Sequence, residues 1–481
     1  MRLRAGIAAV LVAAAAPETS RAAVKPGLEG AQELFRQNRW EEARAHVRGQ
    51  WSALPEKDRG VATFLVGRSY VREAEFYRGL RRFGAEIGLA YLDELGSAKA
   101  NRGVAWIPLF KGFYQAEAEQ YAEAERALAA PGLAPLPAEW RASARYRRAV
   151  ALHRQGRVQE AAAVLKDATA EARLARLLTG GPAEPGPAAP KESGREKALR
   201  AAVLFRAGHA AEAEALVTGL NIDLPDVEDK SDPKKLFRFH DPLVATAWER
   251  IAWERAAVAL KPLAAGGTGP EKALAAYYAG LSLFQLGATE EAAGLLRDAA
   301  TSAGAETQPS ARLLLTAASW KGRTPAAPEL AQAWESTQAQ PDAALLWDEL
   351  RRPELAKLEP FAAKLEARLQ GLLPSSSDRP SGALVGRWGL SRLRHGDEPG
   401  ALVATLSEYR DKSNKNKLEW NDPLLLLALS LANYRNQEYA QALETLFELS
   451  KTFPGLRAVQ WNLQGIYAAR QKAGGEIRIS Q

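Results

Sequence analysis

A five-residue spacing recurs along this chain and restricts it to short antiparallel helix pairs. In "GATEEA" Gly287 precedes Ala292 by five residues, and the same step occurs in "GRVQEA", "GHAAEA" and "GDEPGA". Three variants, "NRWEEA", "EQYAEA" and "QEYAQA", place Asn38, Glu119 or Gln437 at the turn position. Each copy lies between two apolar-periodic runs, and glycine or asparagine accepts the left-handed conformation that ends a helix. The spacing therefore predicts seven helix–turn–helix units.

Three further columns keep register with the alanine of the units. Twelve residues before it the sequence has a small residue, namely Ala31, Gly112, Ala149, Ala201, Gly280, Gly389 or Ser430. Four residues after it stands Val47, Leu128, Leu165, Val217, Leu296, Thr405 or Leu446, all aliphatic except the threonine. Pro55, Pro225 and Pro454 follow at twelve residues, where a helix cannot continue. The columns predict an all-α chain without strands.

These columns resemble the tetratricopeptide repeat, a helix–turn–helix unit of 34 residues. The resemblance is closest over 423–454, 271–300 and 144–168, and "TFLVGRSYV" (63–71) matches a further first helix through Gly67. It implies repeats stacked into a right-handed α-solenoid, a tetratricopeptide-like superhelix. Long gaps between copies predict degenerate repeats around 247–260 and 313–334. A generic helical array remains the alternative.

The N-terminus has the pattern of a secretory signal. Arg2 and Arg4 precede an apolar run over 5–16, and Ser20 and Ala22 occupy the positions that a signal peptidase recognises. This predicts a cleavable signal peptide over 1–22, with an uncleaved anchor as the alternative. The chain has no cysteine, so disulfides and lipidation at an N-terminal cysteine are excluded. We expect a protein of the bacterial periplasm.

Breaks in composition divide the remaining chain. A Pro/Gly/Ala-rich linker over 179–195 follows N-terminal repeats over 23–178, and a short linker over 374–382 follows central degenerate repeats over 196–373. C-terminal repeats with a capping helix (459–470) cover 383–472, and a tail covers 473–481.

No catalytic or metal-binding motif occurs in the sequence, so we expect no enzyme activity, metal or cofactor. The five histidines lack i, i+4 spacing, and the acidic segment 221–232 lacks the glycine of a calcium loop. Six of the twelve tryptophans lie in helical patterns and are expected to fill gaps between helices, namely Trp248, Trp253, Trp334, Trp347, Trp388 and Trp461, with sugar stacking by one or two of them as the alternative. A formal charge of +7 permits weak contact with anionic cell-wall polymers but indicates no nucleic-acid role.

The resemblance also implies a concave groove that is lined by the first helices and binds partners. Its positions here are Tyr146, Val150, His153, Tyr277, Leu281, Phe284, Leu427, Leu431 and Tyr434. They are unusually apolar for a solvated groove. Either the groove holds an apolar peptide or helix, or the array buries these faces itself, which is the interpretation we favour.

Together these features predict a non-enzymatic scaffold or adaptor of the bacterial cell envelope that binds envelope proteins or peptides. Secreted proteins of this family serve outer-membrane assembly, pilus or secretin biogenesis and gliding motility. The alternative is a peptidoglycan-associated helical solenoid similar to the superhelical part of lytic transglycosylases. It would have no catalytic domain, because the Gly-Leu-Met-Gln signature is absent and Met1 is the only methionine.

Overall fold

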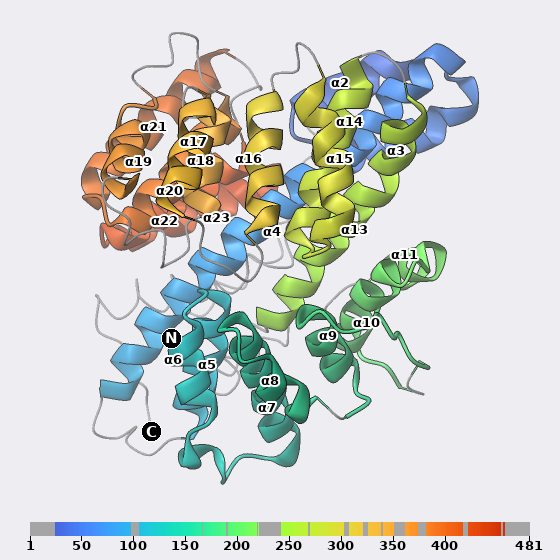
Figure 1. The fold of residues 1–481 in the computed structure, drawn as a ribbon. Coiled ribbons are helices and arrows are strands. Elements are labelled where there is room, and N and C mark those ends of the chain that lie inside the picture. The colour runs from blue at the N-terminus through green and yellow to red at the C-terminus, as the bar shows by residue number, and fades with distance from the viewer. Residues whose placement is uncertain are drawn as a thin grey trace, which may run out of the picture.

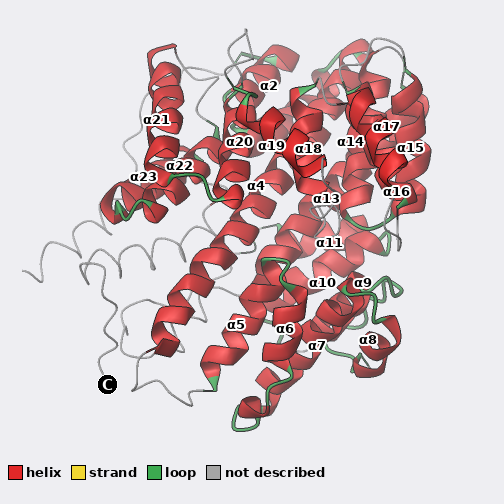
Figure 2. Ribbon diagram, turned by 60° about the vertical axis from the view of Figure 1, so that its left-hand side comes forward, coloured by secondary structure: helices red, strands yellow, loops and turns green. Residues whose placement is uncertain are grey.

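The computed structural model describes most of the chain between residues 25 and 456. The described ranges are 25–97, 105–165, 167–188, 191–218, 220, 242–267, 270–302, 307–320, 326–337, 340–350, 361–373, 381–416, 422–453 and 456. The predicted signal (1–22), acidic segment (221–232), capping helix (459–470) and tail (473–481) lie outside them. Within these ranges the regular elements are 21 α-helices and two 3₁₀ turns, with no strand, as predicted (Figure 2). None of the helices there is both long and apolar enough to cross a membrane.

Most helices form antiparallel pairs along the chain (Figure 1). The N-terminal half contains α2 (Gly27–Arg36), α3 (Trp40–Gln50), η1 (Trp51–Ala53), α4 (Glu56–Ser97), α5 (Trp106–Glu117), α6 (Tyr121–Leu128), η3 (Pro131–Leu133), α7 (Ala138–Arg154), α8 (Val158–Val164), α9 (Ala170–Leu178), α10 (Gly194–Arg206) and α11 (Ala210–Val217). The C-terminal half contains α13 (Pro242–Gly266), α14 (Pro270–Gln285), α15 (Thr289–Thr301), α16 (Gln308–Ser319), α17 (Ala327–Thr337), α18 (Pro341–Leu350), α19 (Phe361–Gln370), α20 (Gly382–His395), α21 (Pro399–Asn416), α22 (Pro423–Arg435) and α23 (Tyr439–Thr452).

The seven predicted turns all occur at the predicted residues. Each of the seven turn residues has a positive φ between 56° and 85°, namely Asn38, Glu119, Gly156, Gly208, Gly287, Gly396 and Gln437. They join α2 to α3, α5 to α6, α7 to α8, α10 to α11, α14 to α15, α20 to α21 and α22 to α23. Local sequence therefore determines where each helix pair turns.

The column residues form the contact within each pair. A Cβ atom added to Gly280 would lie 2.7 Å from Cγ of Leu296, and one added to Gly112 would lie 2.6 Å from Cγ of Leu128. The small residue is thus required because the aliphatic side chain of the second helix occupies that space. All seven small residues are buried.

One pair departs from the predicted register. Ala401 is exposed, whereas Leu402 and Leu406 are buried, and a Cβ added to Gly389 would lie 2.9 Å from Leu406 rather than contact Thr405. The physical reason is that α21 begins at Pro399, one residue further from its turn than the second helix of the α14–α15 pair does. The inward-facing positions move by one residue with it.

Two long helices replace predicted hairpins. Residues 63–71, expected to start a repeat, lie inside α4, which continues for 42 residues without a turn. Residues 247–260, expected to contain a degenerate repeat, lie inside the 25-residue helix α13. The two helices pack along each other so closely that a Cβ on Gly67 would lie 2.3 Å from Cγ of Leu260. In contrast, residues 313–334 do form a helix pair, α16 and α17.

These two helices organise the rest of the molecule. In Figure 1, α4 runs through the middle, with α5 and α6 beside its C-terminal half and α14 to α23 above. Neighbouring helix pairs stack from α14 through α23, as expected for an α-solenoid. The largest hydrophobic cluster includes residues of α4, α13 and this arm, so the core of the protein lies around α4.

Candidate functional site

Helix α4 crosses the inner faces of the first helices in the C-terminal arm. The ring centroid of Phe64 lies 6.1 Å from that of Tyr278 on α14. Further along α4, a Cβ atom added to Gly79 would lie 3.6 Å from Cδ2 of Leu427 on α22. The groove that the sequence places along these faces is therefore occupied in part by the chain's own helix.

The nine predicted groove residues lie mostly in the interior. Six are buried, with 0% to 8% of their surface exposed: Tyr146, Tyr277, Leu281, Leu427, Leu431 and Tyr434. Val150, His153 and Phe284 are half-buried. Tyr146 belongs to a separate cluster, where its hydroxyl donates to Asp167 at 2.5 Å. This burial corresponds to the interpretation that the array covers these faces itself. Of the nine residues, Tyr277 and Leu281 line the cavity between α4 and the arm.

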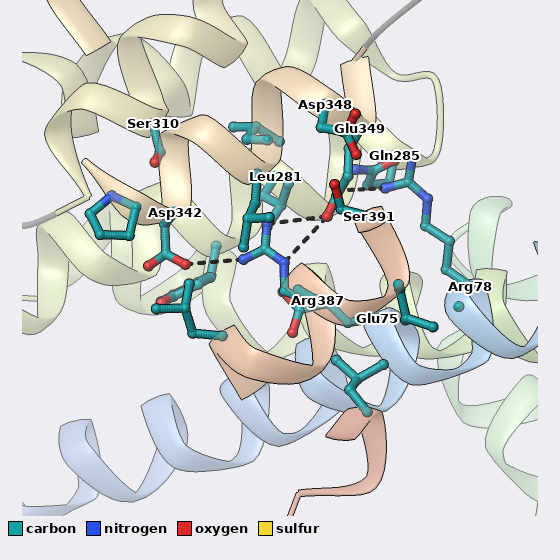
Figure 3. Close-up of a pocket in the computed structure, with 18 of the residues that line it drawn as sticks. Glu75, Arg78, Leu281, Gln285, Ser310, Asp342, Asp348, Glu349, Arg387 and Ser391 are labelled. Atoms are coloured by element: carbon teal, nitrogen blue, oxygen red, sulfur yellow. Dashed lines mark hydrogen bonds and ion pairs between the residues drawn. The ribbon is translucent and has the colours of Figure 1, made fainter. Parts of the chain in front are cut away.

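That cavity lies between α4 and the helices α14, α18 and α20, and has a volume of about 660 Å³ (Figure 3). Volumes of this size are typical of sites that hold a small molecule or a short segment of a partner. Its apolar wall includes Phe64, Phe83, Trp253, Leu274, Tyr277, Tyr278, Leu281, Leu345 and Leu384. Its polar groups include Arg68, Glu75, Arg78, Arg82, Gln285, Thr307, Ser310, Gln340, Asp342, Asp348, Glu349, Arg387, Ser391 and Arg394.

Ion pairs fix most of the charged groups in this cavity. Arg387 contacts Asp342 at 3.1 Å and Glu349 at 3.1 Å, and Arg78 contacts the other oxygen of Glu349 at 3.1 Å, as the dashed lines in Figure 3 show. Glu349 thus joins α18 to both α20 and α4. These side chains are held in place before any ligand arrives, which lowers the entropic cost of binding.

A second group of charges lies at the ends of α18 and α20. Arg394 contacts Asp348 at 3.0 Å, and Nε2 of His395 lies 2.7 Å from the same carboxylate. Burial opposes ionisation of Asp348, but the hydrogen bond from His395 and the charge of Arg394 outweigh it and lower its pKa. His395 lies beside the turn that follows α20, and its side chain is only 13% exposed. No sequence pattern pairs it with Asp348, which lies 47 residues earlier.

Positive charge is concentrated where α4 leaves the cavity. Burial, together with the nearby guanidiniums of Arg394, Arg78 and Arg81, lowers the pKa of Arg82 to about 10. Burial opposes ionisation of its partner Glu119, but the same arginines attract the carboxylate and lower its pKa to about 2. Glu119 also has a positive φ of 65°, a backbone conformation that residues other than glycine rarely adopt. Its ion pair with Arg82 holds the side chain of this turn residue in place.

Arg68 is the exception among the arginines of the cavity. Its guanidinium lies over the ring of Tyr278, 4.1 Å from the centroid, and makes no ion pair with any described residue. Its Nη1 atom is buried without a hydrogen-bond partner in the described part of the chain. The hydroxyl of Thr307, which also lines the cavity, is likewise buried and unpaired there.

The tryptophan expectation is confirmed for the described residues it named. Trp253, Trp334, Trp347 and Trp388 are at most 8% exposed and fill space between helices, and Trp248 is half-buried. Trp461 lies outside the described residues. No group of three or more His, Asp or Glu side chains in the described ranges is arranged to hold a metal ion.

The chain matches no protein-family model, and no curated protein matches it either. The functional argument therefore depends on the fold and on the cavity beside α4.

Proposed function

We propose that this chain is a non-enzymatic scaffold or adaptor of the bacterial cell envelope, built from tetratricopeptide-like helix pairs. The stacked pairs support this class, because such arrays present an extended surface to partners rather than a reaction centre. The basic and apolar N-terminal segment supports export to the periplasm. The partner is an envelope protein or one of its peptides.

The observation that carries this proposal is the cavity between α4 and the arm formed by α14, α18 and α20. Helix α4 fills the inner face at α22 but leaves about 660 Å³ open beside α14. The cavity combines an apolar wall with ion pairs that hold their groups in fixed positions, such as Arg387 with Glu349. Such a surface suits recognition of a partner segment.

The test is photo-crosslinking of the full-length protein in its native host. A photoreactive phenylalanine analogue replaces Leu384, which is half-buried and lines the cavity. The matched control places the same group at Val258 on α13, which is 48% exposed and lies outside the cavity. We expect stoichiometric capture of one or a few envelope proteins from position 384 and much less from position 258.

Two results would contradict the proposal. Equal capture from both positions would remove the cavity as the binding site. Capture of muropeptides or cell-wall enzymes without a stable protein partner would favour the peptidoglycan-associated solenoid instead.

A further inference from the structure

The charges that line the cavity do not balance. Five guanidiniums face four carboxylates, which leaves one positive charge in excess. Four of the arginines have a carboxylate within 3.1 Å, either in the cavity or at its edge. The arginine without one, within the described ranges, is Arg68.

The surroundings of Arg68 restrict where its charge can be neutralised. One face of the guanidinium is covered by Tyr278, so a partner must approach in the plane of the guanidinium. The nearby carboxylate of Glu75 is engaged by Arg72 at 2.8 Å. The buried Nη1 atom therefore needs an acceptor that the described part of the chain does not supply, and leaving it unpaired costs free energy.

Other groups that line the same cavity indicate what else the ligand carries. Phe64 packs against Tyr278 and, with Leu384, forms an apolar wall of the cavity. Thr307 offers a second unpaired polar atom at the start of α16. A ligand that complements these features has a carboxylate beside an apolar group, and the cavity has room for several residues of a peptide.

We propose that the cavity binds a partner peptide through an acidic side chain. The carboxylate accepts hydrogen bonds from Arg68, and a neighbouring apolar side chain of the peptide packs against Phe64 and Leu384. This inference rests on the proposed partner-binding function and names the chemistry by which the cavity recognises its partner.

The experiment compares two libraries of capped hexapeptides on the purified full-length protein. Both libraries vary Ala, Leu, Val and Ser at five positions; the sixth is fixed as Glu in one library and Gln in the other. Retained peptides are identified by affinity selection and mass spectrometry, and the dissociation constant of the best one is measured by fluorescence anisotropy. Octanoate serves as a carboxylate on an apolar body that is not a peptide.

We expect the Glu library to be retained in preference to the Gln library. Arg68→Gln should weaken binding of the best peptide at least about tenfold, because it removes a charge-assisted hydrogen bond. Arg68→Lys keeps the charge and should keep the preference for Glu, and Thr307→Val should weaken binding by a few fold. Arg126→Gln, which changes an arginine whose side chain is 72% exposed on α6, should bind like the wild type. A thermal melt of each variant establishes that it is folded.

The outcomes separate this inference from the function on which it rests. Equal retention of both libraries, or unchanged binding by Arg68→Gln, would overturn the acidic-peptide inference while leaving partner binding in place. Retention of octanoate but of neither library would replace the peptide by a free organic acid. Retention of none of the probes, with equal crosslinking from positions 384 and 258, would overturn both.

Discussion

Arg81 forms ion pairs that join α4 to α13 and to α5. Its substitution is the sharpest test of how these helices pack. Its Nε atom lies 2.7 Å from Glu249 on α13, and its Nη1 atom lies 3.1 Å from Glu117 on α5. The side chains of all three residues are between 10% and 13% exposed. One cation thus compensates two nearly buried carboxylates that belong to different helices.

The substitution Arg81→Met keeps most of the side-chain volume but removes the charge. Loss of one partner from a buried ion pair costs about 3–5 kcal/mol, because the remaining charge stays uncompensated. Here two carboxylates are left, so we expect a loss near the upper end of that range. The triple variant with Glu117→Gln and Glu249→Gln removes the uncompensated charges and should recover at least roughly half of the loss.

The pH dependence of this variant follows from Glu117. Burial raises the pKa of Glu117 even though Arg81 attracts its charged form. Without Arg81 the pKa of Glu117 in the folded state rises further above its value in the unfolded state. The loss of folding free energy caused by the charged carboxylate therefore grows as the pH rises above the unfolded-state pKa, and it disappears when the carboxylate is protonated. The destabilisation by Arg81→Met should therefore be larger at neutral pH than in mild acid.

The assay is urea unfolding followed by far-UV circular dichroism, together with amide hydrogen exchange of α5 and α13. The exchange measurement is needed because helical arrays can open locally before they unfold globally. The control is Arg126→Met, which breaks an exposed pair with Glu123 and should cost no more than about 0.5 kcal/mol. A cost for Arg81→Met within about 1 kcal/mol of the control, or a triple variant no more stable than the single one, would refute the reasoning.

Two further predictions concern a close helix approach and a titrating turn. Gly386→Ala places a Cβ 2.5 Å from backbone atoms of α22 and should cost about 3 kcal/mol, whereas Gly294→Ala on the exposed face of α15 has open space and should stabilise by about 0.5–1 kcal/mol. If the urea midpoints of the two variants moved in the same direction, the close approach of Gly386 to the backbone of α22 would be contradicted. The lowered pKa of Glu119 means that its stabilisation is complete above pH 4.5 and is lost as the pH falls towards about 2. The stability advantage of the wild type over Glu119→Gln, measured in urea at several pH values, should therefore shrink across that window; a constant difference would exclude ionisation of Glu119 as its cause.

Much of the candidate site could not be read from the sequence. The resemblance supplied Tyr277 and Leu281, but the charged residues of the cavity come from α4, α18 and α20, far apart in the chain. Arg78 and Glu349, which make an ion pair, are 271 residues apart. No periodic pattern encodes such a pairing, because periodicity says which face of a helix is apolar and not which helix covers it.

The sequence by itself determined the helix pairs. Turn residues such as Gly287 and Gln437 and columns such as Gly280 with Leu296 act over fewer than twenty residues, so their effect does not depend on the rest of the fold. Only the tertiary structure decided what covers the inner faces of those pairs. Arginine is ordinarily exposed to solvent. On α4, however, Arg72 is 6% exposed and paired with Asp422, 350 residues away. Burial of such a charge is stable only once its partner is in place, and that partner comes from the folded chain as a whole.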